Sequence, residues 1–487
     1  MRSLERRPKR AVIAGFSILI AACGGSRGGG GYMSAPMPPP PAAPTVSVTA
    51  PAAATTINFG QAVTVSWTSM NATSCTASAS DAAAGAFAGS QAASGSMMVA
   101  PTAAGSYTYS LSCMGSGGSM SASSAMVTVS PSILAMLAAA PITTIGPVTA
   151  GNGDDNPYGL ALAPATAGLI TKGDLVVCNF NDAGQTEGNG TTIVGLHPQS
   201  GSMPYPIAQS AMLEGCNALA VLGDDSIAAA AWTAQSSPLV ASNGTLNTPF
   251  SNAAITAPWG EAYVPAQGSS AAALYISNAP GGSSYAGAGN VVRVMLNADA
   301  PTSITEIAKG FCTGGAPGGI YGPAGLTYDA SSDTLYVIDT ASNSVIALSK
   351  VSNIGTDGVT VEGQRTAVTL PAATAMPAFS GASASSARVI AHGAPLNTPL
   401  SATLLADGDL LVGNADIGPT QTNVPSINLM IEVSPWLPGG FVGQPFQADA
   451  TTSGALFGIV ATVDPAGKQI VYFNDDNSNA VMQIGPP

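Results

Sequence analysis

The stretch from Gly322 to Leu348, GPAGLTYDASSDTLYVIDTASNSVIAL, decides how the C-terminal three-quarters of this sequence is interpreted. It opens with a Pro-x-Gly turn and a short apolar run, and two further apolar runs follow across polar turns. Short apolar runs separated by turn residues are typical of β-strands in antiparallel sheets. The stretch therefore predicts three consecutive strands of one small sheet.

The same pattern recurs six times along the chain. The six copies of the turn and first run begin at Pro157, Cys216, Pro258, Pro323, Pro399 and Leu456. One such sheet cannot bury its own faces, whereas six sheets around an axis bury them against one another. The sequence therefore predicts an all-β fold with a six-bladed β-propeller over residues 131–487. Copy six has room for three strands only, so its fourth is expected from PITTIG, residues 141–146.

Two residue types in the repeat have a structural explanation. Gly after the turn lets the innermost strand approach the crowded axis. The second run ends in Asn or Asp in five copies, at Asn179, Asn278, Asp339, Asn414 and Asn474. These side chains are expected to hydrogen-bond the backbone of the following turn, and contact with a ligand or cation is the alternative. The repeat resembles that of NHL-type propellers, which implies the same six-bladed fold.

The candidate binding surface is the face that carries the Pro-x-Gly turns. Long polar loops are expected there after Asn181, Asn278 and Asn414, and such loops often carry function on rigid β scaffolds. Tyr158, Trp259 and Phe457 occupy the middle of their turns, where an aromatic ring could stack on a sugar or peptide. Packing between blades is the alternative role for these three rings.

Glu261 is the unusual residue of the inner strands. It takes the position held by Leu160, Leu326 and Ile459 in other copies. A carboxylate at such a position must be near water or paired, and Arg293 in the same copy is a possible partner. Glu261 therefore has either a structural role or a role in contacting a ligand or metal.

Clustered acidic residues suggest a possible Ca²⁺ site, although they also occur in ordinary turns. Asp154, Asp155, Asp475 and Asp476 would be neighbours if the ring closes as expected, which makes this set the best candidate. The cysteines of the same region are odd in number. Cys178 and Cys216 belong to consecutive copies and are a possible pair, in which case Cys312 is left over.

Residues 45–130 show strict alternation of apolar and polar residues, as in AVTVSWTS and SYTYSLSC. This pattern predicts a small β-sandwich. Cys113 lies on the apolar face, and Cys75 is its expected disulfide partner. The stretch resembles bacterial Ig-like domains, although Trp67 precedes the first cysteine instead of lying between the two. The resemblance implies a spacer or adhesion module.

The N-terminus predicts export. A basic segment precedes twelve apolar residues, Ala11 to Ala22, which are too few for a membrane span and fit a signal peptide over residues 1–22. The sequence IAAC before Gly24 resembles the lipobox of bacterial lipoproteins. That resemblance implies acylation of Cys23 and sorting to the outer membrane. Residues 23–44, rich in Gly and Pro, are expected to form an extended tether.

The composition and the motifs together bound the function. The net charge of −13, with 13 basic residues, disfavours nucleic-acid binding. No HExxH, CxxC or G-x-S-x-G motif is present. We therefore expect a membrane-anchored binding or scaffold lipoprotein whose propeller binds a glycan, a peptide or an envelope protein, with no cofactor except possible Ca²⁺. The alternative is a metal-dependent propeller hydrolase similar to gluconolactonases, which would use inward acidic and amide side chains.

Overall fold

The computed structural model describes residues 36–486 with the exception of 248–252, 269–270, 298–299, 363–375 and 417–425. The chain separates into two compact units, Met1–Ala42 and Ala43–Pro487. The predicted signal peptide, Cys23 and the first part of the tether lie outside the described residues. Among the residues that are described, no helix is both long and apolar enough to cross a membrane.

Residues 45–129 form three small sheets around one core. The sheets are β1 (Thr45–Ala50), β3 (Val63–Met70) and β6 (Ser94–Val99); β2 (Thr55–Ile57), β10 (Val127–Val129) and β7 (Gly105–Tyr107); and β5 (Gly89–Gln91), β4 (Ser74–Ala79), β8 (Tyr109–Gly115) and β9 (Gly118–Ser123). Trp67 and Tyr109 meet Phe87 edge to face in this core. Cys75 pairs directly with Cys113 across β4 and β8, and the predicted disulfide is present.

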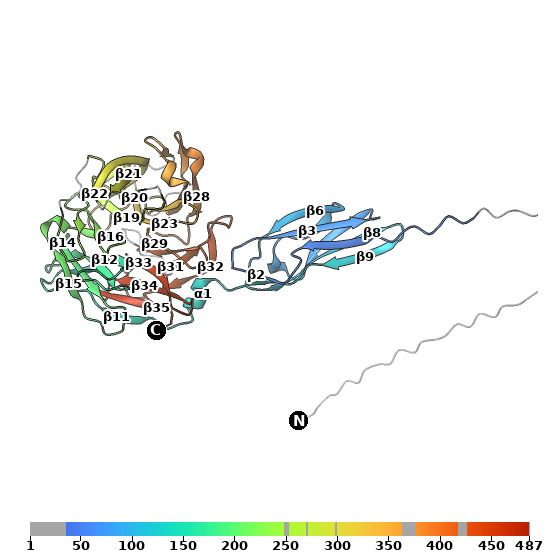
Figure 1. The fold of residues 1–487 in the computed structure, drawn as a ribbon, viewed down its shortest axis with the longest axis horizontal. Helices are drawn as coiled ribbons and strands as arrows, with labels where there is room; N and C mark the ends of the chain where they lie inside the picture. The colour runs from blue at the N-terminus through green and yellow to red at the C-terminus, as the bar shows by residue number, and fades with distance from the viewer. Residues whose placement is uncertain are drawn as a thin grey trace, which may run out of the picture. The chain divides into compact units, whose positions relative to one another are not determined.

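The remaining strands form six sheets, which we call blades 1 to 6 in the chain order of their innermost strands, β12, β16, β19, β23, β29 and β33 (Figure 1). Blade 1 holds β12 (Asp155–Leu162), β13 (Leu175–Asn181), β14 (Glu187–Leu196) and β15 (Tyr205–Gln209), and blade 2 holds β16 (Cys216–Val221), β17 (Ile227–Ala231) and β18 (Leu239–Val240). Blade 3 holds β19 (Pro258–Val264), β20 (Ala272–Asn278), β21 (Gly282–Asn297), β22 (Ala300–Gly315), β26 (Val359–Glu362) and β27 (Ala378–Ser380).

The second half of the ring follows the same plan. Blade 4 holds β23 (Pro323–Asp329), β24 (Thr334–Asp339), β25 (Ser344–Ser349) and β28 (Ala387–His392), and blade 5 holds β29 (Pro399–Leu404), β30 (Leu410–Asn414), β31 (Leu429–Val433) and β32 (Phe441–Gln447). Blade 6 holds β33 (Ile459–Val463), β34 (Gln469–Asp475), β35 (Ala480–Ile484) and β11 (Thr143–Pro147). A short helix, α1 (Ile133–Leu137), precedes β11.

The ring is closed by the two ends of this region. The innermost strands contact one another in chain order, and β33 returns to β12. In blade 6 the fourth strand, β11, pairs antiparallel with β35, so that Thr144 lies opposite Met482. The predicted six-bladed propeller and its closure through the segment at residues 141–146 are therefore confirmed.

The glycine that follows the turn in four of the six copies is needed for close approach between blades. A Cβ atom on Gly260 would lie 2.1 Å from the carbonyl oxygen of Ala324 in the next inner strand, and one on Gly458 would lie 2.6 Å from that of Tyr158. Real Cβ atoms do not come so close to backbone oxygens. The inner strands can therefore reach the axis only because no side chain stands between them, as the sequence predicts.

The Asn and Asp side chains at the ends of the second strands form hydrogen bonds to backbone groups, as expected. Most of these groups do not belong to the following turn, where the sequence predicted them. The amide of Asn179 donates to the carbonyl of Val148, and that of Asn414 donates to the carbonyl of Pro395; both acceptors precede the first strand of the same blade. Asp339 alone follows the expectation, accepting from the amide of Ala341 in the next turn. The role is structural in each case.

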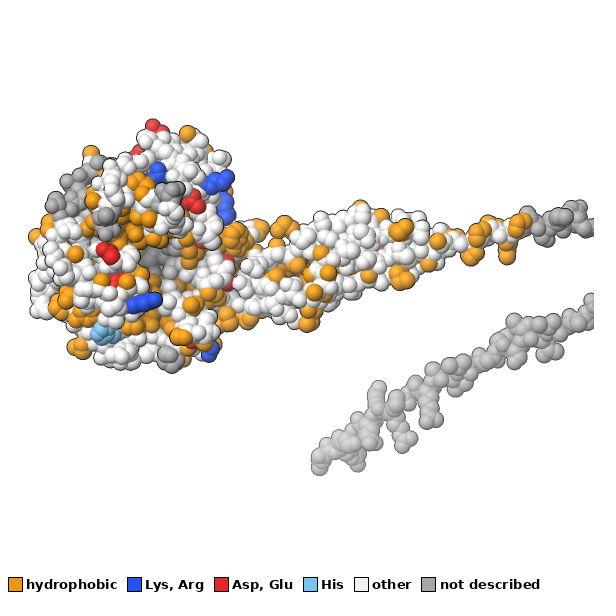
Figure 2. All heavy atoms as spheres, in the orientation of Figure 1, with side chains coloured by type: hydrophobic (Ala, Val, Ile, Leu, Met, Phe, Trp, Pro, Cys, Tyr) orange, Lys and Arg blue, Asp and Glu red, His pale blue; other side chains and the backbone are white. Residues whose placement is uncertain are grey.

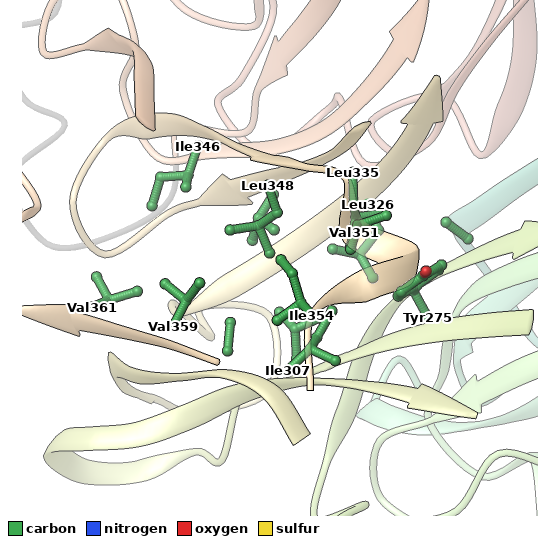
Figure 3. Close-up of a cluster of buried hydrophobic side chains, with 14 of the residues drawn as sticks. Tyr275, Ile307, Leu326, Leu335, Ile346, Leu348, Val351, Ile354, Val359 and Val361 are labelled. Atoms are coloured by element: carbon green, nitrogen blue, oxygen red, sulfur yellow. The ribbon is translucent and has the colours of Figure 1, made fainter. Parts of the chain in front are cut away.

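An insertion joins blades 3 and 4 more closely than the repeat predicts. The segment between β25 and β28 supplies β26, which pairs in parallel with β22 and so extends blade 3. Its side chains Val351, Ile354 and Val359 pack between the two blades with Ile307 and Leu348 (Figure 3). Blades 1 and 2 are joined instead by a disulfide between Cys178 and Cys216, and the third cysteine, Cys312, is buried.

Candidate functional site

The axis of the propeller is lined by consecutive residues from the first strand of every blade. Each blade contributes three consecutive residues, of which the middle one is small. In chain order the first residues are Tyr158, Asn217, Trp259, Ala324, Leu400 and Phe457. The third residues are Leu160, Leu219, Glu261, Leu326, Ala402 and Ile459. Nearly all of them surround a cavity of about 110 Å³. In the space-filling view the ring is hollowed near its centre, and apolar side chains surround the hollow (Figure 2).

The three aromatic residues predicted to bind a ligand lie together, but they form packing contacts. Tyr158 stacks on Phe457 with ring centroids 3.7 Å apart and on Phe180 at 4.2 Å. Trp259 meets Tyr158 edge to face at 6.3 Å. All four side chains are buried, and we call them the aromatic plug. Their rings contact one another, as the packing alternative expects. The three predicted residues also line the axial cavity, so ligand binding by them stays a prediction.

Glu261 lies at the axis as an isolated acid. Its side chain is buried, Oε1 accepts a hydrogen bond from the Ser237 hydroxyl at 2.5 Å, and Oε2 has no hydrogen-bond partner. Burial raises the pKa of this carboxyl to about 8, and the hydrogen bond from Ser237 lowers it in part. At neutral pH the carboxyl is therefore mostly protonated.

Arg293 is not the partner of Glu261. Its guanidinium donates instead to the carbonyl oxygens of Val351 and Ser352 in the inserted segment. The proposed ion pair is therefore wrong, because the side chain of Arg293 leaves the sheet away from the axis. The other polar atoms beside the cavity, Ser401 Oγ and Asn217 Oδ1, also lack partners. The cavity thus offers three polar groups to water or to a very small ligand.

Neither histidine belongs to this site. His197 Nδ1 lies 2.7 Å from the carboxylate of Asp174, and His392 Nδ1 lies 3.0 Å from the hydroxyl of Ser344. His197 follows the third strand of blade 1, and His392 ends the fourth strand of blade 4. A general acid–base pair at the axis would need a second titratable group within hydrogen-bond reach of Glu261.

The predicted Ca²⁺ ligands are used by neighbouring groups. Asp154 accepts from the backbone and hydroxyl of Thr191, Asp155 accepts from Gln185, and Asp475 accepts from Ser478. Ring closure does bring Asp476 near Asp155, and burial with the nearby carboxylates of Glu187, Asp475 and Asp155 raises the pKa of Asp476 to about 7. Among the described residues, however, the carboxylate group with metal-like spacing lies elsewhere. The structure does not assemble the four predicted residues into one site.

A second, larger groove lies beside the aromatic plug. It measures about 600 Å³ and is lined by Trp232, Gly282, Gly315, Ala316, Pro317 and Tyr321. The indole nitrogen of Trp232 donates to the carbonyl of Ala279 at 3.0 Å, which fixes the ring, and the edge of the ring meets Trp259 of the plug. Trp232 remains partly exposed. This partly exposed indole, held in one orientation, can stack on a ligand.

The acidic loop of blade 1 borders the same groove. The carboxylate of Glu187 lies against Gly318, where a Cβ atom would come within 1.5 Å of Oε2, and Pro317 packs beside Gly188. The predicted loop after Asn181 therefore reaches the groove. The loop after Asn278 borders it too, through Gly282. Residues 417–425 of the third predicted loop lie outside the described residues.

One feature of the sequence does distinguish the position of Trp232 from the equivalent positions in the other copies. In the other five copies the second run ends in Asn or Asp, whereas in copy two it ends in Ala231 followed by Trp232. This exception marks the one copy whose second run ends in neither Asn nor Asp. No local feature of the sequence distinguishes Glu187, because its place at the groove depends on contact with Gly318, about 130 residues further along the chain.

Comparison with known proteins gives structural similarity only. No family model matches the sequence, and no curated protein is similar to it. A virginiamycin B lyase from Staphylococcus aureus aligns over 71% of this chain and 99% of its own, at 12% identity and a TM-score of 0.41. A gluconolactonase from Xanthomonas campestris aligns over 71% of this chain and 90% of its own, at 13% identity and a TM-score of 0.43. A regucalcin from Agrobacterium tumefaciens aligns over 70% of this chain and 94% of its own, at 12% identity and a TM-score of 0.38. The fold itself is established by the strand pairing described above.

The raised pKa of Glu261 leads to a test by pH-dependent stability. Because the carboxyl binds its proton more tightly in the folded state than in the unfolded state, its contribution favours folding at low pH and is lost between pH 4.5 and about 8. One pKa unit corresponds to about 1.4 kcal/mol. We therefore expect Glu261→Gln to match the wild type near pH 5 and to be more stable by a few kcal/mol at pH 8.5, measured by urea unfolding.

The difference in free energy of unfolding between the wild type and Glu261→Gln at each pH cancels the contribution of the other acidic residues, which both proteins share. Glu214→Gln is a suitable control, because Glu214 lies in a surface turn after the 3₁₀ segment Ala211–Leu213. Parallel stability curves for the wild type and Glu261→Gln from pH 5 to 8.5 would show that Glu261 titrates normally.

Proposed function

We propose that this chain is an exported, lipid-anchored binding protein that recognises a glycan at the groove beside the aromatic plug. The export signal and the lipobox-like IAAC sequence support anchoring through Cys23 at the outer membrane. The N-terminal sheets then serve as an Ig-like spacer, and the NHL-like propeller carries the binding surface. Loss of the full chain from the membrane fraction in Cys23→Ser, with no loss in Cys312→Ser, tests the anchor.

The observation that carries the proposal is the small size and the lining of the axial cavity. A hydrolase of the gluconolactonase type would need several inward acidic and amide side chains, yet the residues around the axial cavity include one carboxyl and one amide, Glu261 and Asn217. The amide of Asn217 is already used, because it donates to the carbonyl of Trp259. The aromatic plug occupies the positions above them. These features of the axis support recognition at the groove beside it.

The chemistry of the groove favours a sugar. Its walls are an indole, a phenol, a proline and two glycines, which together give a flat apolar surface against which a pyranose ring can stack. Glu187 at its border offers carboxylate oxygens to sugar hydroxyls, and burial raises the pKa of this group. Charged side chains are sparse on the face seen in Figure 2. None of the residues that line the groove carries a charge, so a ligand bound mainly by ion pairs would find few partners in it.

A glycan array with the full chain in detergent tests the proposal. We expect binding to at least one neutral or weakly charged glycan, reduced at least tenfold in Trp232→Ala, since stacking and buried aromatic contacts contribute about 1–3 kcal/mol. Trp436→Ala is the matched control, because Trp436 is 57% exposed in a turn of blade 5 and should leave binding unchanged.

Two results would contradict the proposed function. One is the absence of binding to every glycan by a correctly folded chain. The other is hydrolysis of a gluconolactone that depends on an added divalent ion and is abolished in Glu261→Gln, which would favour the hydrolase alternative.

A further inference from the structure

Three carboxylates gather in blade 5, and none of them lines the groove or the axial cavity. Asp407 and Asp409 lie in the turn between β29 and β30, and Glu432 lies in β31. One oxygen from each carboxylate falls within 4.8 Å of the others. The grouping follows from strand order, since β30 is the neighbour of both β29 and β31 and Glu432 pairs with Leu411 two residues beyond Asp409.

The three acids have no cationic partner among the contacts of the described residues. The ion pairs of the described residues join His197 to Asp174 and Lys309 to Asp357, and neither includes these acids. Glu432 is fully buried, and its oxygens accept only from the backbone amides of Ile133 and Leu134, at 3.2 and 2.6 Å. Three like charges are thus held together with neutral donors alone.

One carboxylate oxygen of these three acids is buried without a hydrogen-bond partner, which indicates that a ligand binds there. Asp409 is 3% exposed, and its Oδ2 atom has no hydrogen-bond partner. A buried carboxylate oxygen without a partner is costly, because its hydration is lost and nothing replaces it. A cation held among the three carboxylates would supply the partner that this oxygen lacks.

We propose that Asp407, Asp409 and Glu432 bind a divalent metal ion of the Ca²⁺ type. The three side chains offer only oxygen atoms as metal ligands, and oxygen ligands suit hard cations such as Ca²⁺. Mg²⁺ demands a regular octahedron and retains its waters, so it fits a site with three protein carboxylates less well. This site differs from the predicted Asp154, Asp155, Asp475 and Asp476 set and from the groove of the proposed function.

A cation here would also fasten α1 to the propeller. Glu432 accepts from the first two amides of α1, and the apolar residues Ile133, Leu134 and Leu137 pack against blades 5 and 6. A bound cation would hold the Glu432 carboxylate in the position from which it accepts from these amides. Removal of the ion should therefore weaken the attachment of α1.

Calcium titration of the full chain in detergent, by isothermal calorimetry after treatment with EDTA, tests the site. We expect one Ca²⁺ per chain from this group and weaker binding of Mg²⁺. Asp409→Asn should weaken Ca²⁺ binding at least tenfold, and Asp407→Asn, at a more exposed position, provides a second variant. Asp464→Asn is the matched control, because Asp464 lies in the equivalent turn of blade 6 and only caps backbone amides.

A second readout follows α1 directly. Hydrogen exchange at residues 133–137 should slow on addition of Ca²⁺ in the wild type and in Asp464→Asn, and should not respond in Asp409→Asn. The proposal is overturned if Ca²⁺ does not bind, or if it binds equally well to Asp409→Asn. It is also overturned if lowering the pH from 8 to 6 stabilises the chain while Ca²⁺ has no effect, since protons alone would then satisfy the group.

Discussion

The pairing of β11 with β35 is the constraint on which the propeller depends. Each blade exposes two apolar faces and can bury them only between neighbours, so the ring must have no free end. Closure is achieved by joining the first strand of this region to its last, some 340 residues apart in the sequence. The close approach of the inner strands at Gly260 and Gly458, and the stacking of the aromatic plug, both require that the ring be shut.

Closing the ring determines where chemistry can take place. Six inner strands in mutual contact leave an axial cavity of about 110 Å³, and the plug formed by Tyr158, Phe180, Trp259 and Phe457 fills the space above it. Glu261 is left with one hydroxyl partner and little room for a substrate. Larger spaces lie away from the axis, and Trp232 lines one of them. The proposed function therefore follows from how the centre of the ring is packed.

The sequence predicted the architecture because propeller repeats are local. The turn, the glycine and the alternating runs lie within thirty residues of one another, and the missing strand of copy six indicated where the ring must close. Contacts between distant segments could not be predicted in the same way. Nothing local shows that Arg293 turns toward Val351, that Glu187 meets Gly318, or that Glu432 gathers with Asp407 and Asp409. Tyr158 and Phe457 were placed together correctly, but their burial depends on Phe180 from a second strand.

The most direct test of the closed ring is a cross-link between its two ends. Thr144 and Met482 lie directly opposite each other in β11 and β35, at a separation that a disulfide can span. In the Thr144→Cys, Met482→Cys double variant we expect mild oxidation of the native protein to join the two peptides, as detected by mass spectrometry, and expect no joining in urea. Failure of the native protein to form this bond, with both thiols still reactive, would contradict the closed six-bladed ring.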